Sequence, residues 1–427
     1  MSHARPRVVA VLPGFIPSTV ICVVKPLMEL HREKQIRLHV TLEGLARRKS
    51  LEQAELVVFC RNTEPKYSSV LEYLQSKNIP FIYDIDDNFF QISAESDDGK
   101  YHSSPERIFM LTRYIQSASL VRVYSESMWN KTKTLNGKIE KVVGPVDFGL
   151  IGLPKRKKDG EKLKIVYATS RLNDELSGIF MPALARILDK YRGRVEAHFW
   201  GPIPSKALGY EGVHYHPFQP NYEKFLQKFS EEEFDIGLAP LKDDEFHRSK
   251  TDNKFREYGA CGIAGIYSSM AVYLSCISEE ETGLLVPNEP QAWYHAISRL
   301  IADDRLRDKI RVQALSYVRQ HYSEKKFEEV WWNQIRQALD GKERAFAIKH
   351  GSNMENELEE CRNEFGKHRT KFLYLAKRFG RLSSRVRNAG VLYILTLLRH
   401  RIYQNWMLLK LRYQTSDFAD IFFHSKE

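Results

Sequence analysis

Short apolar runs alternate with amphipathic stretches of helical period along the first 340 residues. The runs are bounded by charged residues, glycine or proline, as expected of buried parallel strands. They lie at residues 8–12, 36–40, 54–60, 80–87, 120–125, 163–171, 197–201, 213–218, 234–240, 264–268 and 282–287. The helical stretches lie at 68–77, 105–117, 175–191, 292–302, 305–320 and 324–339. This alternation predicts an α/β fold of parallel βα units with helices on both faces of each sheet.

Two breaks divide the pattern. The Gly-Pro pair at 144–145 ends the first series, and the charged stretch 154–160 suits an exposed linker. The 427 residues also exceed the roughly 100–200 of one domain. We therefore predict a Rossmann-like domain at 1–150, a second one at 151–340 and a helical extension at 341–427.

Composition narrows the class of protein. Apolar residues make up 43% of the chain, which is enough for two cores. The five cysteines are odd in number and form no C-x-x-C pair, which favours a reducing compartment and no structural zinc. The N-terminus lacks the pattern of a signal peptide, and no run approaches the ~20 apolar residues that span a bilayer. We expect a cytoplasmic protein.

The stretch 246–268 carries the strongest candidate chemistry. It follows the apolar run 234–240 and contains a short helix that Thr251 can cap and Gly262 can end. A loop that leaves a parallel strand and opens a helix binds anions, because unpaired N–H groups and the helix dipole face the ligand. The stretch is therefore a candidate anion site.

The charged residues of this stretch suit a nucleoside diphosphate. Lys250 and Lys254 can face phosphates, and Glu257 lies three residues after Lys254 on the same helical face. Its carboxylate can accept hydrogen bonds from two ribose hydroxyls. An i,i+3 salt bridge on a solvated helix is the simpler alternative. Tyr258 and its apolar neighbours argue instead for a helix packed beside a site.

These residues resemble the donor-site signature of GT-B glycosyltransferases, especially the family-4-like bacterial enzymes that build surface polysaccharides such as O-antigen. In that family two glutamates separated by seven residues flank the nucleotide sugar. Glu257 matches the second, and Ser249 stands in place of the first. A subgroup is similar to this chain, with Ser-Lys before the helix and Lys-Phe-x-Glu-Tyr inside it. The resemblance implies catalytic roles for Ser249, Lys250 and Glu257, and donor binding by Lys254 and Tyr258.

The resemblance covers roughly residues 7–340 and implies further residues near the donor. Gly14 follows the first strand, and the equivalent loop of the family lies beneath the donor phosphates, with Ser18 and Thr19 on the acceptor side. A tight turn is the alternative explanation of Gly14. Ser170 and Arg171 end the run 163–171, where an arginine fork matches a phosphate.

Three carboxylates and one histidine complete the candidates. Asp84, Asp86 and Asp87 end the run 80–87 and could hold a metal, orient an acceptor hydroxyl, act as a base or cap the next segment. No histidine stands at a useful spacing for a metal, so we expect none, and the resemblance implies the acceptor side. His102 follows in a polar loop. A lone histidine is more often structural, but the family places one near the reacting sugar.

The extension 341–427 differs in charge from the rest. The segment from Cys361 to Arg412 contains thirteen lysines and arginines but only one acidic residue, Glu364. The net charge of the whole chain is +11. Apolar residues there follow helical spacing with the basic residues mostly opposite. Such a helix suits an anionic membrane surface, where each basic residue contributes ~1 kcal/mol. Contact with a second copy or another protein is the alternative. Nucleic acid is not expected, because no recognition motif accompanies the charge.

The combined hypothesis is a retaining, metal-independent GT-B glycosyltransferase that moves a sugar from a nucleotide diphosphate to a growing, lipid-linked glycan. It needs no cofactor beyond the nucleotide-sugar substrate. The resemblance also implies that the last helix returns to the first domain, with Trp331 and Trp332 as its anchor. Two alternatives remain: a nucleotide-sugar epimerase of the same fold, and an inactive scaffold at the membrane, which the missing first glutamate favours. The base, the sugar and the acceptor stay open.

Overall fold

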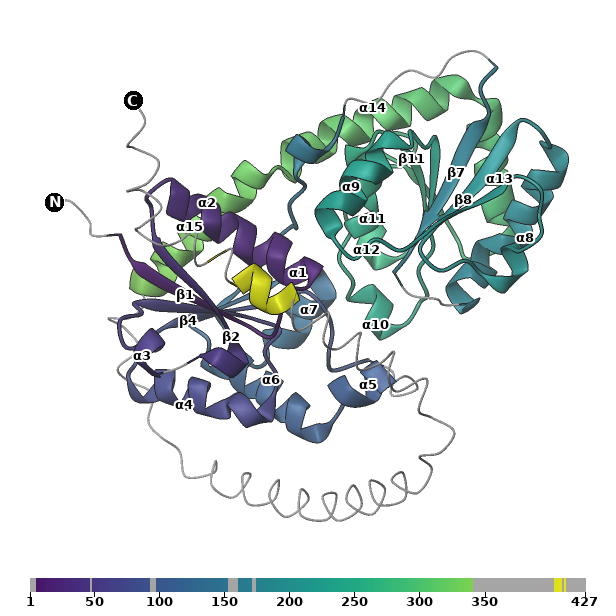
Figure 1. Ribbon diagram of the computed structural model, residues 1–427. Coiled ribbons are helices and arrows are strands. Elements are labelled where there is room, and N and C mark those ends of the chain that lie inside the picture. The colour runs from purple at the N-terminus through teal and green to yellow at the C-terminus, as the bar shows by residue number, and fades with distance from the viewer. Residues whose placement is uncertain are drawn as a thin grey trace, which may run out of the picture.

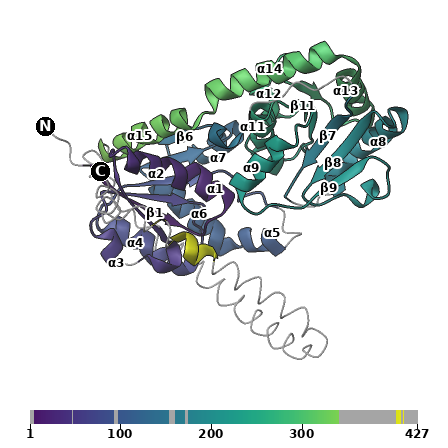
Figure 2. The ribbon, with the colours of Figure 1, turned by 45° about the horizontal axis from the view of Figure 1, so that its top comes forward.

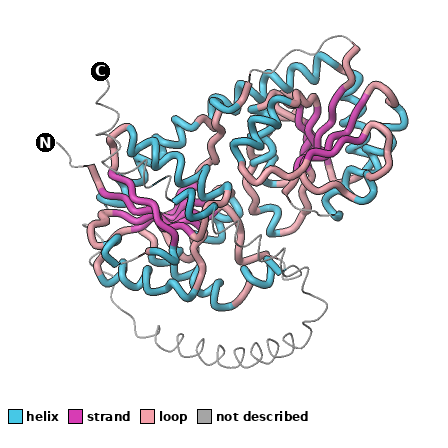
Figure 3. The backbone as a smooth tube through the Cα atoms, in the orientation of Figure 1, coloured by secondary structure: helices cyan, strands magenta, loops and turns pink. Residues whose placement is uncertain are grey.

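The computed structural model describes residues 5–46, 48–92, 97–152, 160–170, 174–340, 403–408 and 411. It contains two α/β domains, each built on a six-stranded sheet in which every strand pair is parallel (Figures 1 and 3). The predicted α/β class with two Rossmann-like sheets is confirmed.

The first sheet has the strand order β2-β1-β3-β4-β5-β6. Its strands are β1 (Arg7–Leu12), β2 (Arg37–Leu42), β3 (Leu56–Cys60), β4 (Phe81–Ile85), β5 (Leu120–Val123) and β6 (Ile139–Lys141). Because side chains alternate along a strand, one sheet face packs on α2 (Lys25–Arg32) and α15 (Glu324–Asp340). The other packs on α3 (Arg48–Leu51), α4 (Ser68–Ser76), α6 (Pro105–Ser117) and α7 (Glu126–Thr132).

The second sheet has the order β12-β11-β10-β7-β8-β9. Its strands are β7 (Leu163–Ala168), β8 (Val195–Trp200), β9 (Val213–His216), β10 (Ile236–Ala239), β11 (Ala264–Ser268) and β12 (Leu284–Val286). Helices α8 (Asp174–Lys190) and α13 (Pro290–Ala302) cover one face. Helices α9 (Tyr222–Glu231), α11 (Asn253–Ala260), α12 (Ala271–Leu274) and α14 (Asp304–His321) cover the other.

The chain returns from the second domain to the first through α14 and α15, which run along one side of both domains (Figure 2). Val146 lies in the segment that leaves the first domain, and Tyr322 lies between α14 and α15. The backbone N–H of Val146 donates to the carbonyl of Tyr322 at 2.8 Å, so the two segments that connect the domains lie side by side. Trp331 is fully buried in the core of the first domain, and its indole N–H donates to the carbonyl of Cys22 at 2.8 Å. Trp331 therefore anchors α15 as expected, while Trp332 is only partly buried.

Several short elements were not predicted. The helical segment after β1 is divided into α1 (Pro17–Thr19), a π-helical turn (Val20–Val24) and α2. Short helices also form where polar loops were expected, at α5 (Asp97–His102) and α10 (Glu245–Arg248). Single 3-10 turns lie at Glu43–Leu45, Pro65–Tyr67, Phe148–Leu150 and Ser205–Ala207. Segments of one turn carry too few residues for a hydrophobic period to show.

The described part of the extension is a short helix at 403–408, drawn in yellow near α1 in Figure 1, followed by residue 411. Leu408 and Leu411 are buried in the core of the first domain, whereas Trp406 is 55% exposed. The rest of the predicted basic extension lies outside the described residues. Within the described ranges, no helix has the length and apolar character needed to cross a bilayer.

Candidate functional site

Each sheet reverses its strand order once. In the first sheet β1 lies between β2 and β3, and in the second β7 lies between β8 and β10. Open α/β sheets bind ligands beyond the carboxyl ends of the strands at such a reversal. We call the loops after β1 and β3 the first reversal point, and the loops after β7 and β10 the second. The predicted donor stretch follows β10, so it lies at the second reversal point.

The loop after β10 is shaped by two helix starts. The carboxylate of Asp244 accepts from the backbone N–H of His247 at 2.8 Å and so caps α10. Asp252, not Thr251, is the N-cap residue of α11, which corrects the predicted cap by one position. Gly262 has φ 64° just after α11, a left-handed conformation that glycine adopts without strain. Gly262 therefore ends the helix as predicted.

Ser249 ends α10 and is only 1% exposed. Its hydroxyl donates to the carbonyl of Glu245 at 2.8 Å and accepts from the side-chain amide of Asn88 at 3.0 Å. The hydroxyl of Ser127 lies 2.8 Å from the same oxygen. One donor and two acceptor positions are all that a hydroxyl has, so Ser249 is fully bonded here.

Further contacts join the same loop to the first domain. The ammonium of Lys250 lies 2.7 Å from a carboxylate oxygen of Asp87. The hydroxyl of Ser125 donates to the carbonyl of Ser249 at 2.9 Å. We call these contacts the interdomain latch; it joins Ser249 and Lys250 to Asp87, Asn88, Ser125 and Ser127. Asn88, Ser125 and Ser127 were not predicted from the sequence. The available signal was that they follow β4 and β5, which are neighbours in the sheet.

Asp86 and Asp87, which follow β4, lie in a different environment from Asp84, which lies within that strand. Asp86 pairs with the guanidinium of Arg61, which also lies 3.5 Å from Asp87. Arg61 was not singled out from the sequence; it follows β3 with φ 61°, at the first reversal point. Both carboxylates therefore stand at the domain contact beside cations. Their acceptor-side role stays a prediction.

Asp84 does not lie with them. It is fully buried, 3.1 Å from the guanidinium of Arg122, and it accepts from the hydroxyl of Tyr124 at 2.9 Å. The guanidinium of Arg122 stacks 3.5 Å from the ring of Trp331. The acceptor-side prediction for Asp84 is corrected, because the alternation of β4 turns its side chain into the core, where it helps to hold α15.

Glu257 and Lys254 form the i,i+3 pair, with the ammonium 2.7 Å from the carboxylate. Glu257 is nevertheless only 5% exposed, so this pair is not on a solvated helix face. Burial and the neighbouring charge of Glu257 raise the pKa of the Tyr222 hydroxyl well above its usual range, which keeps that hydroxyl neutral. Glu257 is thus held in a nearly buried position beside a neutral phenol and a lysine.

Tyr258 is a core residue. It is fully buried, and its hydroxyl donates to the carbonyl of Leu238 at 2.9 Å. A Cβ on Gly237 would approach the ring of Tyr258 to 2.5 Å, so ring and strand are in direct contact. The donor-binding prediction for Tyr258 is corrected, because its hydroxyl is hydrogen-bonded to the backbone of β10 in the core.

The loop after β1 is closed by a residue from the far end of the chain. The side-chain oxygen of Gln404 accepts from the backbone N–H of Phe15 at 2.5 Å and lies beside Gly14. Thr19 is fully buried, and its hydroxyl donates to the carbonyl of Gly14 at 2.7 Å. Thr19 therefore shapes the loop, which corrects its predicted acceptor-side role. Ser18 is partly buried.

The remaining candidates lie apart from the latch residues. His102 ends α5, and its ring centroid is 4.9 Å from that of Phe89, the residue after Asn88. Ser170 is exposed after β7, at the second reversal point. Arg171 lies outside the described residues. The structure thus brings Ser170, Ser249, Lys250, Lys254 and Glu257 to the loops and helix at one reversal point.

A separate cavity lies beside the segments that connect the two domains. A cavity of about 510 Å³ between α2 and α15 is lined by charged residues, including Lys25, Glu324 and Glu328. Lys25 lies 3.3 Å from Glu223 and 3.4 Å from Glu324, so it links the two domains. None of the predicted site residues is among the residues that line this cavity.

Solved structures share this architecture. HepE from Anabaena, in complex with UDP and glucose, matches with a TM-score of 0.56 and 13% identity over 78% of this chain and 100% of that chain. Sucrose-phosphate synthase from Thermosynechococcus elongatus gives 0.58 and 13% over 79% and 100%. A glycosyltransferase from Rickettsia africae ESF-5 gives 0.55 and 13% over 79% and 99%. A scan against protein-family models and a search of curated proteins gave no match. The chain therefore has the GT-B fold that these proteins share.

Proposed function

We propose that this chain is a glycosyltransferase that takes a nucleoside-diphosphate sugar as donor and transfers the sugar with retention of configuration. The observation that most supports this proposal is the basic loop between β10 and α11, which lies at the reversal point of the second sheet in a GT-B fold. Such a position offers backbone N–H groups and a helix dipole to an anion. The HepE structure with UDP-glucose makes uridine diphosphate sugars the first donors to test.

Lys250 and Lys254 would stabilise the charge that develops on the leaving diphosphate. Preorganised cations and a helix N-terminus do this in place of a metal ion. In the present conformation Lys250 bonds Asp87, so donor binding requires this pair to be exchanged for a phosphate. Ser170 and Arg171 would contact the phosphates from the neighbouring loop.

Glu257 would bind the ribose. Its carboxylate already accepts from Lys254, and a carboxylate has enough lone pairs to accept from a diol as well. Ser249 would act by holding the latch closed over the bound donor, because its hydroxyl is fully bonded within the protein.

The acceptor would enter from the first domain. Asp86, Asp87 and His102 belong to the first domain, and Ser18 lies in α1, which follows the loop after β1. A growing surface glycan on a lipid carrier is the proposed acceptor. Residues 361–412 would hold the enzyme at the anionic inner face of the membrane, or join it to a second copy. The helix at 403–408 packs on the first domain, so the contact would be made by other residues of this extension.

The enzyme hypothesis is tested by following turnover. Purified protein is incubated with UDP-, GDP- and dTDP-sugars, with and without membrane lipid extract, and released nucleoside diphosphate and sugar configuration are measured. Release that depends on lipid extract supports the transferase. Change of the sugar without acceptor would support the epimerase instead.

An inactive scaffold is the second candidate, and one observation favours it. The position of the first family glutamate holds a buried Ser249 whose hydroxyl has no further bonding capacity in this conformation. A folded protein that neither binds nor turns over any of these compounds would support the scaffold and contradict the enzyme.

A further inference from the structure

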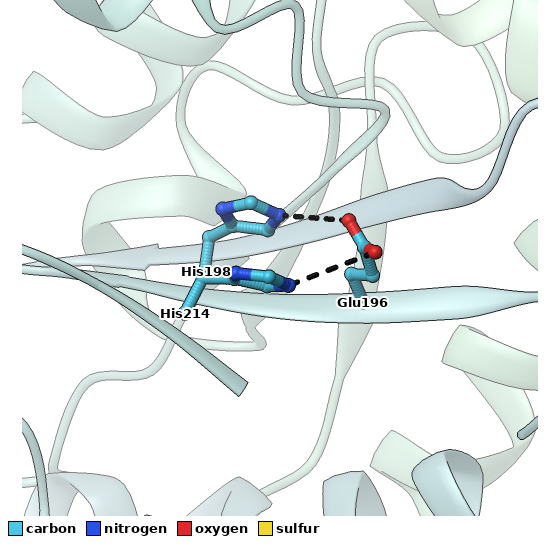
Figure 4. Close-up of side chains that lie close together, drawn as sticks. All are labelled: Glu196, His198 and His214. Carbon is cyan, nitrogen blue, oxygen red and sulfur yellow. Dashed lines mark ion pairs between the residues drawn. The ribbon is translucent and has the colours of Figure 1, made fainter. Parts of the chain in front are cut away.

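Three polar side chains converge on the outer strands of the second sheet, far along the sheet from β11 and β12. Glu196 and His198 come from β8, and His214 comes from the edge strand β9 (Figure 4). His198 pairs with His214 in the register of the two strands, so their side chains share one sheet face with Glu196, two residues away. The ligand atoms of the three residues all lie within 4.8 Å of one another.

The distances suit a shared ion. Nε2 of His198 lies 3.7 Å from one carboxylate oxygen of Glu196, and Nε2 of His214 lies 3.6 Å from the other. Ligands about 2.0–2.2 Å from a tetrahedral ion are separated by roughly 3.3–3.6 Å. The two imidazole rings are stacked with centroids 4.7 Å apart and planes 18° apart.

His198 supplies the observation that calls for a ligand. Its side chain is only 6% exposed, and its Nε2 has no hydrogen-bond partner among the described residues. The other ring nitrogen, Nδ1, lies 2.9 Å from Nε2 of His216. A buried ring nitrogen without a partner is destabilising, because it has lost its bond to water.

The network behind His198 sets which nitrogen carries the proton. Nδ1 of His216 faces the carboxylate of Glu232 at 3.8 Å, which favours a proton on that nitrogen. Nε2 of His216 is then the acceptor, and Nδ1–H of His198 is the donor. This leaves a bare lone pair on Nε2 of His198, directed at Glu196. Metal-bound histidines are commonly oriented in this way through their second nitrogen.

We propose that Glu196, His198 and His214 bind one divalent transition-metal ion, with Zn²⁺ as the best match and water as the fourth ligand. Imidazole and carboxylate together are a common zinc ligand set. His214 is half exposed, which provides a path for the ion and room for the water.

The ion would have a structural role. Glu196 is the second residue of β8, so the cluster lies toward the amino ends of the strands, whereas the donor stretch lies at their carboxyl ends. The edge strand β9 is short and mostly exposed. An ion shared by β8 and β9 would stabilise this edge, because metal binding adds to folding free energy. Sequence analysis missed the set, because its members come from two strands.

Lys162 provides a specific signature. Its ammonium lies 2.8 Å from Glu196, and its side chain is half exposed, so it can swing into water when the ion binds. A positive charge at this oxygen competes with a cation. Lys162→Gln is therefore expected to tighten zinc binding several-fold, whereas a purely structural salt bridge would give no such effect.

The test uses the full-length protein after treatment with a chelator. Zn²⁺ is titrated by calorimetry, bound zinc is counted by elemental analysis, and Co²⁺ is added to record the visible bands of a tetrahedral site. We expect one zinc ion per chain at this site and a higher melting temperature with Zn²⁺ but not with Mg²⁺. His214→Gln is expected to weaken zinc binding at least about tenfold.

His214 is the best position to change, because its exposure makes loss of folding a minor concern. Glu196→Gln is the second variant, and far-ultraviolet circular dichroism checks both. His295→Gln is the matched control, since this histidine is exposed on α13 in the same domain. Zinc binding that is absent, or equal in wild type and in folded His214→Gln and Glu196→Gln, would overturn the proposal.

Discussion

The two reversal points share a topology and differ in what their loops present. At the first, the loop after β1 is covered by Gln404 from the end of the chain, and Thr19 fills its interior. At the second, the loop after β10 and the first turn of α11 present Lys250 and Lys254, and Ser170 is exposed after β7. A single reversal of strand order can thus be closed by side chains in one domain and be lined by basic residues in the other. The side chains at the strand ends make the difference.

The charges that meet between the two domains are complementary. Asp86 and Asp87 follow β4 of the first domain, next to Arg61 after β3, and Asp87 bonds Lys250 of the second domain. An acidic edge that meets a basic loop fixes the register of the two domains. A donor phosphate would compete with Asp87 for Lys250. From this comparison we propose that the second domain binds the ligand and that the first domain provides closure.

The largest effect is expected from Arg122→Met, which tests whether Asp84 serves folding. The substitution leaves a buried carboxylate without its partner and should lower the free energy of unfolding by about 3–5 kcal/mol. Denaturant unfolding measures it. The control is Arg113→Met, whose pair with the half-exposed Glu72 should contribute under ~1 kcal/mol. Equal effects of the two variants would show that Asp84 is not a structural residue.

Glu257→Gln tests the assignment of ligand binding to the second domain. A lost hydrogen bond to a charged group is worth about 1.5–3 kcal/mol, so affinity for the nucleoside diphosphate should fall roughly ten- to hundredfold. Calorimetry with the folded variant measures this affinity. The control Asp308→Asn breaks another i,i+3 pair, with Arg311 on α14, and should leave affinity unchanged. Unchanged affinity in Glu257→Gln would contradict the ribose assignment.

Gln404→Ala tests closure of the first reversal point. It removes the acceptor from a buried N–H of Phe15 and should lower stability by about 1–3 kcal/mol. Hydrogen exchange at Phe15 should become faster and the melting temperature should fall. Asn405→Ala, at the exposed neighbouring position, should change neither quantity. Donor affinity unaffected by Gln404→Ala would agree with binding by the second domain.

The smallest effect is expected from the latch. Lys250→Gln removes a partly exposed cation, so diphosphate affinity should fall by about fivefold, equivalent to ~1 kcal/mol. Asp87→Asn removes the competing carboxylate and should leave affinity equal or higher. A loss in Asp87→Asn as large as that in Lys250→Gln would mean that the latch, and not the phosphate contact, governs binding.

Much of the fold could be predicted from the sequence, because each buried strand is an apolar run and each long helix an amphipathic one. The run 264–268 matches β11 (Ala264–Ser268), and 105–117 matches α6 (Pro105–Ser117). The short elements α7, α10 and α12 and the edge strand β6 were missed, because such segments are too short for periodicity to be informative. The ten-residue helix α9 was missed as well, although its pattern is amphipathic.

The site was harder to predict, because its contacts join distant segments. No local pattern indicates that Ser249 meets Asn88, or that Gln404 covers Phe15. The position of a residue at a strand end was informative for Asp87 and Lys250. It failed for Asp84, whose side chain the pleat turns inward, and for Tyr258, which faces the sheet.

The most direct test of the central claim is thermal melting of the purified protein with UDP, GDP, dTDP and CMP compounds. A ligand that binds only the folded state stabilises it by about 2.7 kcal/mol at a hundredfold excess over its dissociation constant. We expect a higher melting temperature with one nucleoside diphosphate, and loss of that shift in Glu257→Gln. Folded protein that shows no shift with any compound, or a shift that Glu257→Gln retains in full, would contradict a donor site at the second reversal point.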